Sequence, residues 1–543
     1  MKRLLYIIPI LIALFLASCD DELDKRHTDP DEFTEANIEF LFTQGASNSI
    51  MADYTNYYTY VYANFGTYTQ ALARNTTTSK YTSYEPTGDL GCWDLYYTTR
   101  MAEFVEMQRI YQYNISESEK EQYHPYIYAG KIIMAYNTMF ATDLYGSIPY
   151  SEGWGARLGL FGQPTNLTPK YDTQKDIYYS ILADLKEAAT FMKNNALNTS
   201  ITKHKVFLTQ DIVYGGNYSK WYKYANSLRL RAAMRISDVD AAKAKEVLGD
   251  LSLSDLITDN ADNAYTFREN AANAANSGYV DGGIWRALKD RANNGVPFYA
   301  PENMVKIFNE AKDPRLNVFF QSASDVDGVV REKDAEIIGM PESCDVLSNE
   351  LNSKDITAIE YYGIVNSATV RNNPAFPAGV SITASDVYFL LAEAQTKGLI
   401  NMGNAEDFYN KGVILSIQEY YTYYRNSTGP TREESIANTD TSDDTLAEWL
   451  ASSPYKFNAS TALEQIARQR WIHHWIAQPY EEWTEYRRTD LPQMVDDRES
   501  NALLNQGNAP VKLRYPTLEA SMNPNNFPSS EDNIKQRVWW DVN

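Results

Sequence analysis

The chain has 543 residues, an apolar share of 44% and a formal net charge of −22 at pH 7. Because one hydrophobic core stops growing beyond about 300 residues, we expect two lobes or a large helical array. The strong negative charge repels phosphate backbones, which argues against nucleic acid as a partner. No apolar run after residue 17 is long enough to cross a bilayer, so we expect a water-soluble body.

The first 19 residues have the layout of a secretory signal. Two basic residues are followed by an apolar run over 4–17 and by small residues before Cys19. The order Leu-Ala-Ser-Cys at 16–19 resembles the lipobox of bacterial lipoproteins, in which the signal is removed before a lipid-bearing cysteine. The resemblance implies a signal peptide at 1–18, acyl chains such as palmitate on Cys19, and a mature charge of −24 after loss of two basic residues. The alternative is a soluble secreted protein with a chance cysteine at the cleavage site.

Residues 19–37 are polar and charged and are predicted to form a flexible tether. The acidic run at 20–24 resembles a signal that sends some lipoproteins to the outer face of the outer membrane. Its alternative is an ordinary solvated linker. We therefore expect a lipid-anchored protein of the outer membrane that faces outward, with its folded domain at 38–543.

Apolar residues at spacings of three and four predict a mostly helical chain. The predicted helices span 38–70, 93–110, 123–143, 168–194, 220–236, 383–397, 405–421 and 461–475. Gly146 is placed to end the third of these with a left-handed cap, and Pro149 prevents its continuation. Successive helical hairpins predict an α-solenoid or repeat-like scaffold.

Three stretches between these helices are predicted to be irregular. Residues 74–91 are rich in Thr, Ser and Gly and should form a loop. Residues 237–383 should form an irregular lobe inserted into the scaffold, with strand-like runs at 317–321 and 356–364. Residues 425–460 should be a polar loop with at most one short helix.

Cysteine and aromatic usage add little that is decisive. Once Cys19 is lipidated, Cys92 and Cys344 remain, and they either pair or stay buried thiols. The chain has 41 Tyr, 10 Trp and 20 Phe. Aromatic faces stack on sugar rings, but Tyr is also a common core residue. Composition therefore favours glycan or peptide binding only modestly.

Motifs of the common catalytic sites are absent. His473 and His474, two of only five histidines, point about 100° apart on a helix and are poorly placed to share a metal. No His-Glu-x-x-His, Gly-x-Ser-x-Gly or Gly-x-x-x-x-Gly-Lys occurs, and Asp440–Asp444 lacks the spacing of a calcium loop. We predict no catalytic residue, metal or cofactor. A glycosidase needs only two carboxylates about 5–10 Å apart, and that alternative stays open.

Five sequence blocks resemble the SusD/RagB family and run in the family's order. The blocks are YNTMFATDLYGSIPYSE at 136–152, WYKYANSLRLRAAMRI at 221–236, LEQIARQRWIHHWIAQPYEEWTEYRRTDL at 463–491, KLRYPTLEASMNPNN at 512–526 and RVWWDVN at 537–543. They match the Asp-x-Tyr-Gly-x-x-Pro-Tyr turn, the Trp-x-Lys-x-Ala-Asn-Ser helix, the Glu-x-Trp-x-x-x-Arg-Arg-Thr segment, the Arg-Tyr-Pro segment and the terminal Trp-Trp. Each block is weak alone, whereas five in order are specific. The Gly often found before the Glu-x-Trp segment is replaced by Gln478-Pro479.

The resemblance implies a tetratricopeptide-like helical-hairpin scaffold with an irregular, loop-rich ligand-binding lobe. Members of the family are surface lipoproteins that bind oligosaccharides, or in some members peptides. They deliver these nutrients to a TonB-dependent SusC-like transporter in the outer membrane and are not enzymes. The implied partners of this chain are therefore an oligosaccharide, the transporter and, through the lipid anchor, the outer membrane.

The motif residues are predicted to be structural. Asp143, Tyr145 and Pro149 should hold a buried turn, in which Asp143 caps or bonds exposed backbone amides. The charged motif residues should form ion pairs within the scaffold, namely Glu481, Arg487 and Arg488.

Ligand contacts are expected outside these blocks, on loop aromatics that are hard to bury. We predict Trp285 first and Tyr84 second, followed by Tyr81, Tyr279, Tyr299, Arg74, Asn75 and Asn294. The alternative for each is packing against the chain's own loops. Three functions are weighed on this basis: a glycan-binding uptake lipoprotein, the same scaffold capturing peptides or another nutrient, and a surface glycoside hydrolase.

Overall fold

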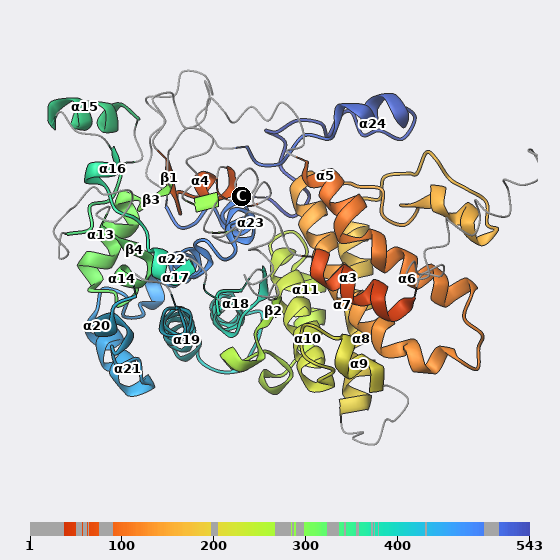
Figure 1. The fold of residues 1–543 in the computed structure, drawn as a ribbon, viewed down its shortest axis with the longest axis horizontal. Helices are drawn as coiled ribbons and strands as arrows, with labels where there is room; N and C mark the ends of the chain where they lie inside the picture. Colours follow the sequence, from red (N-terminus) through yellow and green to blue (C-terminus); the bar gives the residue numbers. More distant parts are fainter. Residues whose placement is uncertain are drawn as a thin grey trace, which may run out of the picture.

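The structure of the chain is a computed structural model (Figure 1). It describes residues 37–49, 64–74, 91–196, 205–266, 298–322, 336–341, 344–354, 358–370, 379–428, 432–493 and 510–542, and the single residues 57, 62, 284, 287, 288, 373, 375, 376 and 377. The predicted signal peptide and all but the last residue of the predicted tether lie outside the described residues. Helices dominate the described part and strands are short, which confirms the mostly α prediction.

The N-terminal half forms a helical bundle, drawn from red to yellow in Figure 1. Helix α8 packs against both α7 and α10, and α3 packs against α6. Asn217 caps α10, because its side chain accepts a hydrogen bond from the backbone N–H of Lys220. The helices are α3 (Ile38–Asn48), α5 (Cys92–Asp94), α6 (Ala102–Tyr113), α7 (Lys120–Tyr145), α8 (Gln174–Ala196), α9 (Lys205–Gln210), α10 (Tyr218–Arg235) and α11 (Ala241–Gly249). The short helix α4 (Gly66–Tyr68) lies apart from them and packs against α23 (Pro479–Thr489).

Helix α7 ends much as the sequence predicts, but with a different cap. Gly146 has φ +84° and ψ −119°, a conformation with positive φ that favours glycine yet lies outside the left-handed helical region. Its backbone N–H donates to the carbonyl of Thr142, and Ile148 then bridges to Asp172. The predicted left-handed cap is therefore wrong in its ψ, because the chain has to leave the helix toward this bridge.

The C-terminal half is built on the hairpin of α18 (Ala384–Thr396) and α19 (Ala405–Arg425), which turns at Gly398 as predicted. Gly412 lets the two helices approach, since a Cβ there would lie 2.7 Å from Cε1 of Phe389. Helix α18 also packs against α22. The remaining helices of this half are α20 (Glu434–Ala437), α21 (Asp443–Ser452), α22 (Ala462–His474), α23 (Pro479–Thr489) and α24 (Thr517–Met522).

Helices α20 and α21 correct the prediction of at most one short helix between 425 and 460. Helix α21 packs against α19 and buries Leu446 and Leu450. These two residues are four apart and share one face. The polar composition of the segment conceals this narrow apolar face.

Two small antiparallel sheets accompany the helices: the larger lies near α13 and α14, and the smaller packs against α10 (Figure 1). The first has the strand order β1-β3-β5-β4, and the second pairs β2 with β6. The strands are β1 (Ala73–Arg74), β2 (Ala264–Thr266), β3 (Phe298–Tyr299), β4 (Phe320–Gln321), β5 (Ile364–Val365) and β6 (Gly379–Ile382). The helices between them are α13 (Glu302–Ala311), α14 (Leu316–Phe319), α15 (Cys344–Lys354), α16 (Ala358–Tyr361) and α17 (Ser367–Val370).

The two predicted strand-like runs are largely wrong. Residues 316–319 are helical and only 320–321 are in a strand, while 358–361 are helical before the strand at 364–365. Phe319 stacks on Trp475 with ring centroids 3.9 Å apart, and neither ring is exposed. Long-range packing thus overrides the local preference of this apolar run for a strand.

One apolar core joins the helices. Five tryptophans are fully buried in it, namely Trp221, Trp471, Trp475, Trp483 and Trp540. Cys92 is buried in the same core, whereas the side chain of Cys344 lies outside the described residues, so their pairing stays untested. Within the described ranges, no helix combines the length and the apolar character that a membrane span requires.

Candidate functional site

The four-stranded sheet brings two predicted ligand segments to one edge of the fold. Strand β1 leads into residues 75–90, and β3 directly follows residues 289–297. Arg74 pairs with Phe298 in an antiparallel register, and Ala73 pairs with Tyr299. The end of β1 therefore lies beside the beginning of β3, so both segments join the described fold at the same place.

The structure places few of the predicted ligand residues. Arg74 lies on β1, with its side chain outside the described part. The residues Trp285, Tyr84, Tyr81, Tyr279, Asn75 and Asn294 lie outside the described residues altogether and stay predictions. Tyr299 is 2% exposed, and its ring lies edge-on to that of Tyr362. The predicted exposure of this ring is wrong, because it packs in an apolar cluster with Met340 and Leu347.

The motif blocks converge instead on a group of charged side chains inside the helical body. Helices α7, α10, α18, α22 and α23 each contribute to it, and its side chains are at most 6% exposed. We call it the buried ion network: Asp143, Arg231, Arg235, Asp386, Glu393, Arg470, His474, Glu481, Glu482, Glu485 and Arg488. Buried charges are tolerated only when they are paired and hydrogen-bonded, which explains why these side chains lie together.

Arg235 joins three parts of the network. Its Nη1 lies 2.6 Å from Oδ2 of Asp143 on α7, and its Nη2 lies 2.5 Å from Oε1 of Glu481 on α23. The same Nη2 lies 3.1 Å from Oε1 of Glu485. Arg488 holds Glu393 of α18 with two hydrogen bonds of 2.8 and 2.6 Å. A guanidinium can bind several carboxylates at fixed angles, which suits it to tie helices together.

Asp386 is the second centre of the network. It accepts hydrogen bonds from Arg231 Nη2 at 2.8 Å and from Arg470 Nε at 2.9 Å, and it contacts His474 Nε2 at 3.1 Å. Burial alone would raise the pKa of this carboxyl, but Arg470 and Arg231 hold it well below its usual range.

His474 is held between two carboxylates. Its Nδ1 lies 2.9 Å from Oε2 of Glu482, opposite the contact of its Nε2 with Asp386. Burial lowers the pKa of the imidazole, but the two carboxylates outweigh it and raise the pKa to about 9. Burial raises the pKa of Glu482 as well, and we assign the shared proton to His474, because both of its nitrogens face acceptors. The pair is therefore an ion pair at neutral pH.

The C-terminal tail closes the predicted turn after α7. Trp540 Nε1 donates to Oδ1 of Asp143 at 2.8 Å. The hydroxyl of Tyr515 lies 2.9 and 2.8 Å from the carbonyl oxygens of Tyr145 and Ser147. The prediction that this turn is buried and structural is confirmed. Asp143, however, bonds side chains such as those of Trp540 and Tyr178 rather than the predicted backbone amides, because the tail and α8 approach it.

The predicted ion pairs of Glu481 and Arg488 are confirmed. Arg487 is different: its Nη1 donates to the carbonyls of Asp143 and Val511, and its guanidinium lies 3.8 Å from the ring centre of Trp483. The predicted ion pair of Arg487 is thus replaced by carbonyl and cation–π contacts. The reason is that this side of α23 faces the turn and the tail instead of another acidic helix.

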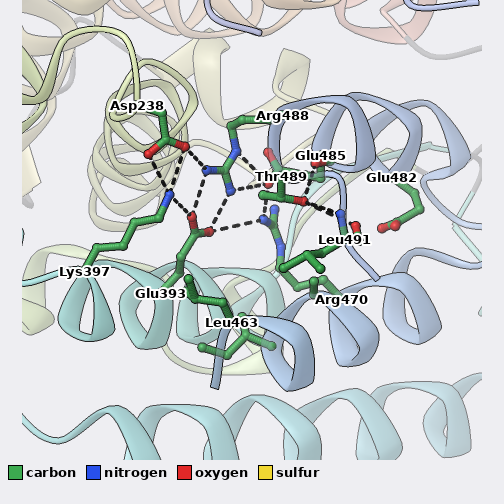
Figure 2. Close-up of a pocket in the computed structure, with 12 residues that line it drawn as sticks. Asp238, Glu393, Lys397, Leu463, Arg470, Glu482, Glu485, Arg488, Thr489 and Leu491 are labelled. Atoms are coloured by element: carbon green, nitrogen blue, oxygen red, sulfur yellow. Dashed lines mark hydrogen bonds and ion pairs between the residues drawn. The ribbon is translucent and has the colours of Figure 1, made fainter. Parts of the chain in front are cut away.

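A cavity of about 220 Å³ opens at the rim of the network (Figure 2). Leu463 and Leu491 line its apolar side, and charged groups from α18, α22 and α23 line the other. Those charges are already paired. Lys397 Nζ lies 2.9 Å from both Asp238 and Glu393, and the other wall residues bind each other as described above.

Two carboxylates of this cavity, those of Glu393 and Glu485, are poorly suited to acid catalysis. Arg488 and Lys397 overcome the effect of burial and lower the pKa of Glu393 to about 2. Arg470 and Arg488 likewise hold the pKa of the buried Glu485 well below its usual range. A general acid needs a proton near neutral pH, which these two carboxyl groups do not retain. The cavity is better explained as the rim of the ion network than as a catalytic cleft.

One acid outside the network does retain a proton. Burial raises the pKa of Glu419 to about 7, although Tyr265 and Tyr423 both donate to its Oε1 at 2.5 Å. Glu419 is 4% exposed on α19. Its carboxyl therefore faces the protein interior.

Sequence reasoning missed most of the network. The signal was present in part, because Arg231 and Arg235 are four residues apart on a helix whose neighbouring residues are apolar. Arg470 and His474 repeat this spacing on α22. Such pairs indicate a charged stripe on a buried helical face. What could not be read from spacing is which acids, in which other helices, complete them.

The chain is similar to one protein family and to several solved structures. A SusD-like family model, described as "Starch-binding associating with outer membrane", matches residues 30–516. No curated protein matches the chain. A solved chitin-binding protein superposes with a TM-score of 0.72 at 23% identity, over 93% of this chain and 100% of its own.

Other solved structures have the same fold. A SusD homolog from Bacteroides uniformis gives a TM-score of 0.69 at 23% identity, over 93% of this chain and 99% of its own. A chitin-binding SusD homolog from Flavobacterium johnsoniae gives 0.66 at 20% identity, over 93% and 99%. At these identities the structural likeness shows the fold alone, whereas the family match covers most of the sequence.

The network yields a direct test of its structural role. We expect Asp386→Asn to lower the free energy of unfolding by about 3–5 kcal/mol, because Arg231 and Arg470 lose the charge that compensates them. Asp443→Asn is the matched control: its side chain is 60% exposed and pairs with Lys411, so we expect a change of about 0–1 kcal/mol. Chemical denaturation of both variants measures the difference. Equal losses would contradict the assignment.

Because Glu419 is buried, we expect the stability of the folded state to fall as the pH rises, which is opposite to the effect of a salt-bridged acid. Its pKa is raised in the folded state, so the folded state binds the extra proton and stability falls as the pH rises from about 4.5 to 7. The expected loss is about 3 kcal/mol for a shift of this size. Glu419→Gln removes the ionisable group, and its stability relative to wild type should rise across this range and then level off.

The control for this titration is Glu246→Gln, whose side chain is 66% exposed beside Lys243. Its stability relative to wild type should change little between pH 4.5 and 7. Denaturation midpoints measured at several pH values give both curves. If the difference in stability between Glu419→Gln and the wild type did not change with pH, the buried carboxyl would not hold a proton.

Proposed function

The chain belongs to the SusD-like family, and from that membership we propose that it is a surface lipoprotein that captures oligosaccharide nutrients and delivers them to a TonB-dependent SusC-like transporter. The description of the family match, starch binding and association with the outer membrane, supports a glycan ligand and this location. Two structurally similar proteins carry chitin binding in their names, which supports the same ligand class.

The observation that carries the proposal is the register of β1 with β3. It brings the segment at 75–90 and the segment before Phe298 to one edge of the fold. The two segments, 75–90 and 289–297, hold four of the eight predicted ligand residues, Asn75, Tyr81, Tyr84 and Asn294, and Arg74 at the end of β1 is a fifth. A site made from two loops on a rigid support can present several aromatic rings to one sugar chain.

The lipid anchor completes the proposed arrangement. Cys19 would carry the acyl chains, and 17 residues, 20–36, separate it from the described body. A fully extended segment of this length spans at most about 60 Å at 3.3–3.6 Å per residue. The body can therefore stay close to a transporter in the same membrane while the tether allows it to move.

The partners of the buried acidic side chains support a binding role rather than a catalytic one. The carboxylates at the 220 Å³ cavity are paired with cations, and Glu419, whose pKa is raised to about 7, accepts hydrogen bonds from two tyrosines. Neither arrangement offers a pair of accessible carboxyl groups, one protonated and one ionised, as glycoside hydrolysis requires. The proposal is therefore that sugars bind and leave intact.

The experiment is calorimetry of the chain from Asp20 to Asn543, which keeps every described residue, against starch, chitin and other oligosaccharides. The same mixtures are analysed by thin-layer chromatography after a day. We expect heat of binding for at least one class, with every sugar intact. Cleavage products would overturn the proposal in favour of a hydrolase. No binding to any sugar would overturn it in favour of a peptide ligand, for which a peptide panel is the next test.

Trp285 gives a prediction at the level of one residue. If its ring stacks on the ligand, Trp285→Ala should weaken binding of the best oligosaccharide by about 1–3 kcal/mol. Tyr113→Ala, which removes a 38% exposed ring at the end of α6, is the control and should leave affinity unchanged. Both variants should keep the melting temperature of the wild type within a few degrees. Unchanged affinity for Trp285→Ala would remove this residue from the proposed site.

A further inference from the structure

We propose that a polar pocket between α13 and α22 is a separate subsite for one neutral sugar unit of an oligosaccharide. This inference rests on the proposed function, since it takes the ligand to be a glycan. It adds a second contact region made entirely of described residues. None of these residues belongs to the ligand contacts predicted from the sequence.

The pocket has a volume of about 190 Å³ and lies between two helical faces. Helix α13 contributes four residues at positions i, i+3, i+4 and i+7, which share one face. At about 30 Å³ per water molecule, the volume equals about six waters, which is the size of one hexose rather than of a chain. The lining residues are Asn303, Lys306, Ile307, Glu310, Arg468, Trp471, Pro492 and Gln493.

The polar groups of α13 in this pocket are available to a ligand. The side chains of Asn303, Lys306 and Glu310 form no hydrogen bond or ion pair with the described residues. They supply an amide, three ammonium donors and a carboxylate acceptor. Each hydroxyl of a sugar both donates and accepts, so a mixed set of this kind can satisfy neighbouring hydroxyl groups, while Ile307 offers an apolar surface to the C–H groups of the ring.

The larger cavity of Figure 2 is less suited to a sugar than the pocket between α13 and α22. There the charged wall residues already bind one another, as Lys397 does with Asp238 and Glu393. A sugar entering that cavity would have to replace strong ion pairs with weaker hydrogen bonds. In the α13–α22 pocket, a sugar replaces only water around the side chains of α13.

The charges of the pocket favour a neutral ligand. Lys306 and Glu310 carry opposite charges, and Arg468 Nη2 lies 2.8 Å from Oε1 of Glu464. The positive and negative groups therefore balance locally. The chain as a whole carries −22, which disfavours a sulfated or uronic-acid chain.

The pocket lies beside the sheet edge where the predicted ligand segments join the fold. Trp471 Nε1 donates to the carbonyl of Thr69 at 2.8 Å, and Thr69 precedes β1 by four residues. On the other wall, α13 begins at Glu302, three residues after the end of β3. Figure 1 shows α13, β3, β1 and α22 as neighbours. A long oligosaccharide bound at the edge can therefore place one further unit in the pocket.

The test uses chain length as its readout. Calorimetry of the chain from Asp20 to Asn543 is done with maltooligosaccharides and chitooligosaccharides, from disaccharide to heptasaccharide. The double variant Lys306→Ala/Glu310→Ala should bind the longest wild-type ligand about tenfold more weakly, because hydrogen bonds to charged groups are lost. It should bind the shortest one as the wild type does. Asn309→Ala, exposed on α13 outside the pocket, is the control and should change neither.

The outcomes separate this inference from the proposed function. If the wild type binds a series and the double variant binds every length equally well, the subsite is overturned while the proposed function stands. If the wild type binds neither series nor any other sugar, the proposed function fails and the subsite with it. Because both substituted side chains are exposed, the variants should keep the wild-type melting temperature. A loss confined to long ligands in a folded variant supports the subsite.

Discussion

The structure depends above all on the need to neutralise charges buried between five helices. Each carboxylate or guanidinium taken out of water costs several kcal/mol unless a partner of opposite charge is held against it. Arg235 meets this requirement only if α7, α10 and α23 take one relative placement. Asp386 imposes the same condition on α10, α18 and α22. Apolar packing alone tolerates small displacements, whereas these ion pairs tolerate far less.

Because of this constraint, the side chains that hold the helices together are different from those that are available to a ligand. The motif blocks that show the family are used inside the body: Trp540 and Tyr515 close the turn after α7, and Arg488 joins α23 to α18. Side chains committed to such contacts are not available to a ligand. In the function that we propose, recognition falls to the segments that leave the body at β1 and β3, and to side chains such as Lys306 that the network does not use.

The same reasoning distinguishes the two cavities. Both contain charged residues and have similar volumes, about 220 and 190 Å³. What differs is whether the charges are already paired. Glu393 is held by Arg488 and Lys397, so its cavity is part of the scaffold. Glu310 has no such partner among the described residues, so its carboxylate can accept hydrogen bonds from a ligand.

The sequence by itself determined the family, the mostly helical fold and the cores of the long helices, because apolar spacing reports the buried face of a helix from neighbouring residues alone. It also indicated that Glu481 and Arg488 are structural. Only the tertiary structure decided their partners, since Arg235 and Glu485 are 250 residues apart and no local pattern links them. It likewise decided the burial of Tyr299, the helix at 316–319 and the pocket between α13 and α22. Each of these depends on surfaces that meet only when distant segments fold together.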